Sequence, residues 1–163
     1  MSRNLRAILR ESYDRRAEER DAKPAPDWEL RERGAFCELL RRERRHSVLD
    51  LGAATGTDAE FFRENGLDAV CVDLSPEMIR RCREKGLRGH VMHLTDLRFP
   101  EGSFDAAYAE NSLVHLPKAE LPAALRRISP IVMPGGLFYV ALDGGYEFEG
   151  EGEWDTYEPR VHG

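Results

Sequence analysis

The chain has 163 residues, with 24 Lys and Arg against 30 Asp and Glu and a net charge of −6, so it fits one domain with a single core. It contains no signal-peptide pattern and no apolar run of about 18 residues, which argues against a membrane-bound protein and predicts a cytoplasmic one. Its basic residues alternate with acids instead of forming a stripe, so we expect no nucleic-acid partner.

The three cysteines, Cys37, Cys71 and Cys82, lack the spacing of a metal or redox site. Each lies within an apolar pattern, so we expect buried free thiols and no metal ion.

Two amphipathic helices precede the first predicted strand. Apolar residues at helical spacing predict one helix over residues 4–22 and a second over residues 28–45. Pro24 and Pro26 separate the two. Tyr13 lies on the apolar face of the first helix.

A short apolar run from Val48 to Leu51 is typical of a buried strand, and it gives way to small residues up to Gly56. Glycines let a backbone approach a ligand closely, and the helix that follows, with Asp58 as its expected cap, offers free N–H groups to an anion. Asp50 is badly placed for a pyrophosphate but suits an ammonium group. An amino acid moiety, which carries both charges, therefore fits this stretch best.

The second predicted strand, Ala69 to Val72, ends at Asp73. Ser75 is expected to cap the next helix, with Pro76 in its first position. A crossover helix between two parallel strands would bring Asp73 beside the glycine loop, where its carboxylate can accept both hydroxyls of a ribose.

These two stretches resemble motifs I and II of the class I S-adenosylmethionine-dependent methyltransferases, of the small-molecule type found in the methyltransferase 11/25 domain group. The usual motif I has three alternating glycines, whereas this chain has Gly52, Ala54 and Gly56. The resemblance implies an α/β fold: a doubly wound, Rossmann-like parallel sheet in the order 3-2-1-4-5 with N-terminal helices.

The remaining elements follow the same pattern. A third strand is predicted at His90–Met92, a fourth at Phe104–Ala109, a helix at Leu121–Ile128 stopped by Pro130, a tight turn at Met133–Gly136 and a fifth strand at Leu137–Leu142.

The cofactor implied by the resemblance is S-adenosylmethionine, with S-adenosylhomocysteine as product. Asp50 would face the methionine ammonium group, Asp73 the ribose, and His93 with Leu94 the adenine. His93 stands where the family has an acid, so Asp96 is an alternative adenine contact. The full predicted cofactor-binding set is Asp50, Gly52, Ala53, Ala54, Gly56, Asp73, Leu74, His93, Leu94, Asp96 and Glu110.

The fourth strand ends at Glu110, and polar residues follow it. Ligands in open α/β sheets sit at the carboxyl ends of strands, so Asn111 and His115 are candidates to orient the substrate or remove a proton from it. Tyr13 joins them because the family's N-terminal helix covers the active site. No catalytic residue is assigned, because transfer of an activated methyl group depends chiefly on alignment.

The predicted organisation is an N-terminal helical lid (1–45), a cofactor-binding core (46–142) and an acidic tail (143–163). The family's sheet normally ends in an antiparallel strand pair, and residues 143–163 show no strand alternation. We therefore expect that pair to be absent, which leaves the fifth strand as an exposed edge. Either the sequence is a fragment or a shortened product, or a partner chain covers that edge, as a second copy would in a homodimer.

The predicted function is methyl transfer to an unidentified small-molecule substrate. One alternative is a module that binds the cofactor but is catalytically inactive or regulatory. A second is a dinucleotide oxidoreductase, although its Gly-x-Gly-x-x-Gly pattern is not matched here.

Overall fold

The computed structural model describes residues 3–142, and the predicted acidic tail lies outside them. Its five strands form one parallel sheet in the order β3-β2-β1-β4-β5, as the sequence predicts. The strands are β1 Ser47–Leu51, β2 Asp68–Asp73, β3 Arg88–Val91, β4 Phe104–Glu110 and β5 Val132–Ala141.

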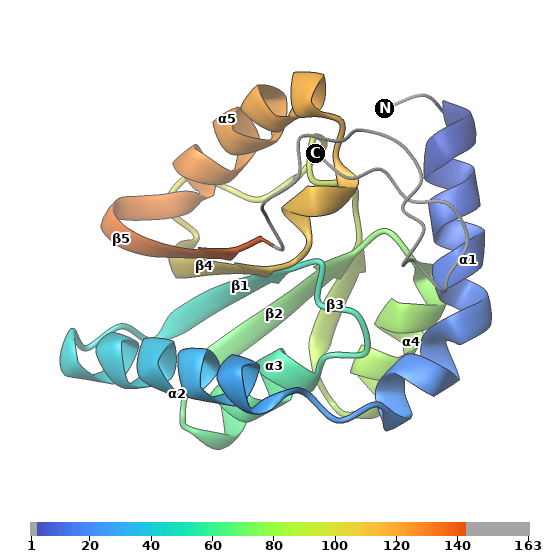
Figure 1. Ribbon diagram of the computed structural model, residues 1–163. Coiled ribbons are helices and arrows are strands. Elements are labelled where there is room, and N and C mark those ends of the chain that lie inside the picture. Colours follow the sequence, from blue (N-terminus) through green and yellow to red (C-terminus); the bar gives the residue numbers. More distant parts are fainter. Residues whose placement is uncertain (1–2, 143–163) are drawn as a thin grey trace.

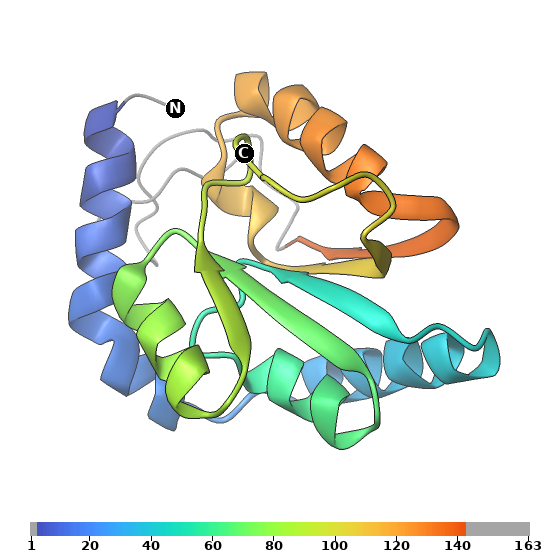
Figure 2. The same cartoon turned by 180° about the vertical axis from the view of Figure 1, so that it is seen from behind.

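Helices cover both faces of the sheet (Figures 1 and 2). They are α1 Arg3–Ala22, α2 Asp27–Arg42, α3 Thr57–Glu64, α4 Pro76–Glu84 and α5 Leu121–Ile131, with short 3₁₀ turns η1 Leu113–His115 and η2 Lys118–Glu120. One face packs against α2, α3 and α4, and the other packs against α5 and the chain between β3 and β4.

Neighbouring residues of β1 point into the two different cores. Val48 packs with Phe36 of α2 and Phe62 of α3, whereas Leu49 packs with Ile128 of α5. Both β1 side chains are completely buried. This burial on both faces is why β1 reads as a continuous apolar run rather than an alternating one.

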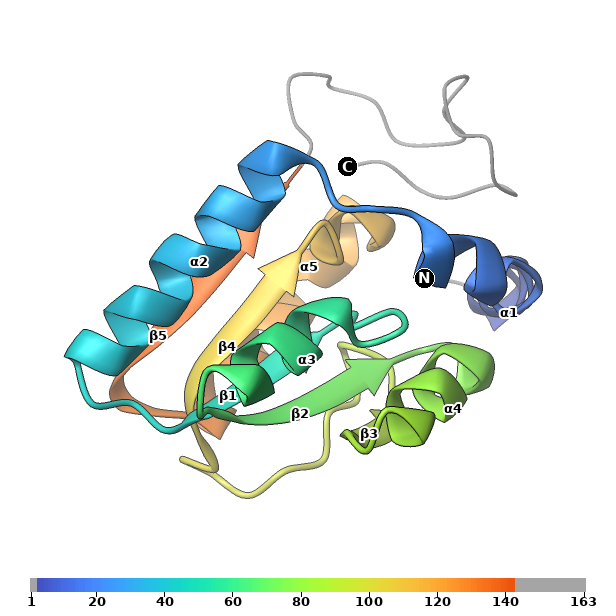
Figure 3. The same cartoon turned by 90° about the horizontal axis from the view of Figure 1, so that it is seen from below.

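Among the described strands, β5 has a single neighbour, β4, and forms an edge of the sheet. Figure 3 shows α2 lying along β4 and β5, and the Phe36 ring contacts the rings of Tyr108 and Tyr139 there. The prediction that a second copy of the chain covers this edge remains a prediction.

The structure corrects the predicted end of the last helix and the start of the last strand. Pro130 does not stop α5, which continues to Ile131. Because Pro130 is the second-last residue of the helix, only the one hydrogen bond that its missing N–H would have made is lost there. The predicted tight turn at Met133–Gly136 instead lies within β5, as an irregularity where the pairing shifts between Phe104 and Ala106.

The second helix is also shorter than predicted, because α2 ends at Arg42 and Arg44 adopts a left-handed φ of 57°. Within residues 3–142, no helix combines the length and the apolar character needed to cross a membrane.

Candidate functional site

A cavity of about 800 Å³ opens at the carboxyl ends of the strands. Its walls come from α1, the loop between α1 and α2, the glycine loop, the ends of β2 and β3, and the segment after β4. The predicted residues that line it are Gly52, Ala53, Ala54, Asp73, Leu74, His93, Leu94, Glu110, Tyr13, Asn111 and His115.

Three predicted residues are not part of the lining. Asp50 is 2% exposed and lies behind the glycine loop. Gly56 forms the N-terminal boundary of α3. Asp96 is exposed and pairs with Arg98 at 3.2 Å.

The glycine loop is held close to its neighbours by its backbone. The N–H groups of Gly52 and Ala53 both donate to the Val72 carbonyl, at 2.8 and 2.9 Å. A Cβ on Gly52 would lie 2.3 Å from the Cβ of Ser112, and Gly52 has a φ of 71°. Only glycine fits here, which brings the glycine loop against the segment after β4.

Ala54 occupies the position where motif I usually has its middle glycine. Its φ is 49°, in the left-handed region that glycine adopts freely and alanine does not. The loop therefore keeps the conformation of a glycine although alanine stands there. The backbone N–H of Ala54 donates to Asp73 Oδ2 at 2.9 Å.

Asp73 is held by two backbone donors at the end of β2. Oδ2 accepts from Ala54 N, and Oδ1 accepts from Ser75 N at 2.9 Å. Burial raises the pKa of the Asp73 carboxyl, while these two hydrogen bonds and the charge of Arg20 oppose the rise. The carboxylate is thus fixed in place beside the glycine loop, as predicted from the motif spacing.

Asp50, which is buried, and Asp58, which is half-buried, are two acids near the same loop. Asp50 Oδ2 has no hydrogen-bond partner among the described residues, and burial raises the pKa of Asp50 well above its usual range. Asp58 is not the predicted helix cap, because Gly56 takes that position without a side-chain hydrogen bond. Asp58 instead lines the cavity and accepts from Arg33 Nη1 at 3.0 Å.

His93 lines the cavity at the end of β3. Its Nδ1 lies 2.7 Å from Thr95 Oγ1 and accepts from Thr95 N at 3.2 Å. Burial, together with the charge of Arg6, lowers the pKa of His93 to about 4. The imidazole is therefore neutral near pH 7.

Tyr13 of α1 and His115 of η1 meet across the cavity, with Tyr13 Oη 2.8 Å from His115 Nε2. The sequence analysis missed Arg20, which lines the cavity and lies 5.3 Å above the Tyr13 ring. Its position two helical turns after Tyr13 was the available signal, since this spacing places both side chains on one helix face.

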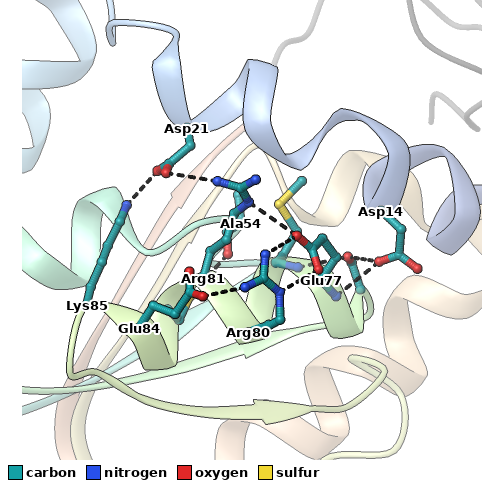
Figure 4. A network of polar contacts seen from close by, with 11 residues as sticks. Asp14, Asp21, Ala54, Glu77, Arg80, Arg81, Glu84 and Lys85 are labelled. Atoms are coloured by element: carbon teal, nitrogen blue, oxygen red, sulfur yellow. Dashed lines mark hydrogen bonds and ion pairs between the residues drawn. The ribbon is translucent and has the colours of Figure 1, made fainter.

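Polar contacts tie α1 to α4 (Figure 4). Asp14 accepts from Ser75 Oγ and, at 3.1 Å, from the backbone N–H of Glu77. Two helical turns further along α1, Asp21 pairs with Lys85 at 2.6 Å and with Arg81 at 3.5 Å. These contacts hold α1 over the carboxyl edge of the sheet, where it forms one wall of the cavity.

The described part of the chain contains no group of three or more His, Cys, Asp or Glu side chains that could hold a metal ion. All three cysteines are buried free thiols, as predicted. Cys82 Sγ donates to the Ala54 carbonyl at 3.2 Å, so this thiol links α4 to the glycine loop.

A family model described as a methyltransferase domain matches residues 48–136, which is more than half of the chain. The chain belongs to the class I S-adenosylmethionine-dependent methyltransferases. This assignment confirms the predicted family and replaces the dinucleotide oxidoreductase alternative.

Curated methyltransferases of several kinds are similar to this chain. A malonyl-[acyl-carrier protein] O-methyltransferase of Halorhodospira halophila is 31% identical over 96% of this chain and 56% of the relative. A glycine N-methyltransferase of Rattus norvegicus is 34% identical over 63% of this chain and 42% of the relative. The chain thus spans about half the length of the curated relatives it matches.

Solved structures share the fold. The structure described as the "DhpI-SAM-HEP complex" matches 100% of this chain and 84% of its own, with a TM-score of 0.73 and 23% identity. A 1,6-didemethyltoxoflavin-N1-methyltransferase of Burkholderia thailandensis, with S-adenosylhomocysteine bound, matches 96% and 71%, with a TM-score of 0.68 and 23% identity.

Proposed function

We propose that the cavity of this methyltransferase-family chain binds S-adenosylmethionine and supports transfer of its methyl group to a small molecule. The observation that carries the proposal is the Asp73 carboxylate, fixed by two backbone donors beside a loop that keeps the glycine conformation. The two solved structures named above contain SAM and S-adenosylhomocysteine by their descriptions, which supports the choice of cofactor.

The residues present fit this cofactor. Each Asp73 oxygen accepts one N–H, and a carboxylate has about four acceptor positions, so lone pairs remain for two ribose hydroxyls. Asp58 lines the cavity beside the glycine loop, and Asp50 lies behind that loop with an unpaired oxygen. Asp58, which also accepts from Arg33, faces the cavity and can accept from an ammonium group, and the cavity volume of about 800 Å³ leaves room for an acceptor.

The cofactor supplies a methyl group already activated on a sulfonium, so the chain's own residues need to align the acceptor and exclude water. α1 covers the cavity and is fixed on α4 through Asp14 and Asp21. Water exclusion is therefore the part we assign to this helix.

The acceptor end of the cavity is formed by Tyr13, Asn111 and His115. We assign the orientation of the acceptor to Tyr13 and Asn111. Proton removal from an acceptor that carries a proton is assigned to His115, whose Nε2 lies 2.8 Å from Tyr13 Oη. The relatives are methyltransferases by name, so the inactive alternative has no support.

Calorimetric titration with S-adenosylmethionine tests the cofactor site. We expect the native chain to bind with micromolar affinity and the Asp73→Asn variant to bind about 10-fold more weakly or worse, because a hydroxyl then loses its charged acceptor. The matched control is Asp68→Asn, since Asp68 starts the same strand but is exposed and pairs with Arg88.

A folded native chain that does not bind the cofactor would contradict the proposal. Equal losses in the Asp73 and Asp68 variants, with thermal melts showing that both fold, would contradict the role of Asp73.

A further inference from the structure

The end of the cavity near β3 has apolar walls and one polar side chain, the imidazole of His93. The walls come from Leu74, Met78, Met92 and Leu94, and His93 lies among them. Asp73 pairs with Val91 across the two strands, and Met92 N donates to the Asp73 carbonyl at 3.1 Å. A purine attached to a ribose at Asp73 therefore enters this apolar end, where His93 is the polar side chain that meets its edge.

Hydrogen bonds determine which nitrogen of His93 carries the proton. The backbone N–H of Thr95 donates to Nδ1, so Nδ1 presents a lone pair. Thr95 Oγ1, which accepts from Arg6 Nη2 at 3.2 Å, lies 2.7 Å from Nδ1 and can share its hydroxyl proton with the same lone pair. Since the imidazole is neutral, its proton is on Nε2, and His93 offers the cavity a donor.

A donor at this position has a consequence for the choice of base. Adenine has a donor amino group at C6 and an acceptor at N1, whereas hypoxanthine has an acceptor oxygen at C6 and a donor at N1. An ionised carboxylate only accepts hydrogen bonds, so it pairs with the adenine amino group and repels the hypoxanthine oxygen. The Nε2–H of His93 can donate to adenine N1 or to hypoxanthine O6.

We propose that His93 relaxes the base specificity of the cofactor site, so that the chain binds the 6-oxopurine analogue of its cofactor about as well as the 6-aminopurine form. This inference rests on the proposed function and deepens it. Arg6 and Thr95 act as positioning residues, because they touch His93 and set its tautomer.

Calorimetry with two ligands, S-adenosylhomocysteine and its hypoxanthine analogue S-inosylhomocysteine, tests the inference. For the native chain we expect the two affinities to agree within about threefold. For His93→Asp we expect a preference of about 10-fold or more for the adenine form, because a carboxylate pairs with one base and repels the other. The matched control is His90→Asp, on the strand β3 that precedes His93 but outside the cavity lining, which should behave like the native chain.

The outcomes separate the inference from the function on which it rests. If the native chain binds S-adenosylhomocysteine but prefers it by about 10-fold or more, the inference is overturned while the cofactor site stands. If a folded native chain binds neither ligand, the proposed function itself fails.

The tautomer has its own measurement, which does not depend on whether the His93→Asp variant folds. Nitrogen-15 NMR of histidine-labelled native chain, assigned with His93→Gln, should show a protonated Nε2 and an unprotonated Nδ1 at pH 7. A proton on Nδ1 would contradict the inference.

Discussion

The two ends of the cavity are built in different ways. At the proposed cofactor end, the groups come from two short stretches: the glycine loop, and the Asp73 carboxylate held by the backbone N–H groups of Ala54 and Ser75. At the acceptor end, Tyr13 and His115 meet although they are 102 positions apart in the chain. Backbone conformation thus determines the first end, and packing of α1 determines the second.

The sharpest test of the cofactor end is Gly56→Ala. Gly56 has a φ of 88°, and an added Cβ would lie 2.7 Å from Leu87 Cδ1 and 3.0 Å from Cys82 Sγ. We expect the free energy of unfolding to fall by about 2–4 kcal/mol, from backbone strain and overpacking together.

The control is Gly66→Ala, at a φ of 86° with no atom near the added Cβ. Strain alone should cost about 1–2 kcal/mol there. Equal losses in the two variants, measured by urea unfolding, would show that crowding beneath the loop contributes nothing.

His93 lies at the proposed cofactor end, and its protonation should appear in the pH dependence of stability. The folded pKa is about 4, below the unfolded value of 6.5. As the pH falls from 6.5 to 4, the unfolded chain gains a proton that the folded chain does not, so the free energy of unfolding decreases. After allowance for solvent screening of this half-buried group, we expect a decrease of about 1–2 kcal/mol.

Urea unfolding at several pH values measures this, with His93→Gln as the comparison. Other groups titrate in the same range, so the prediction concerns the difference between the two profiles. Parallel profiles would mean that the pKa of His93 is not lowered by folding.

At the acceptor end, Tyr13→Phe removes the hydroxyl that contacts His115. We expect a loss of about 0.5–1.5 kcal/mol in the free energy of unfolding, with S-adenosylmethionine affinity unchanged within about twofold, because Asp73 and the glycine loop are untouched. Tyr139→Phe, on the α2 side of β5, is the matched control. A large loss of cofactor affinity in Tyr13→Phe would contradict the proposed division of the cavity into a cofactor end and an acceptor end.

The smallest expected effect is a gain. Ala54 holds a φ of 49°, so Ala54→Gly should raise the free energy of unfolding by about 0.5 kcal/mol, as relief of strain exceeds the added freedom of the unfolded chain. Ala53→Gly, whose φ is not positive, should instead be destabilising. If both glycine variants lose stability alike, the loop conformation at Ala54 is not strained.

Much of the fold could be predicted because its signals are local. Ser75 accepts from Met78 N as the expected cap with Pro76 at the helix start, and Gly66, just after α3, takes a left-handed φ that glycine adopts freely. Local signals also misled. Pro130 usually ends a helix, but so close to the helix end its cost is small, and α5 includes it.

The sequence by itself determined which stretches form strands, the glycine loop and the cap at Ser75, because short stretches specify these through their own backbone preferences. The order of the strands followed from the family resemblance of the two motifs. Only the tertiary structure decided that Asp58 pairs with Arg33 instead of capping α3, and that Arg20 lines the cavity. It also decided that Arg6 and Thr95 determine which nitrogen of His93 carries the proton. These contacts join residues distant in sequence, and their geometry depends on how α1 and α2 pack on the sheet.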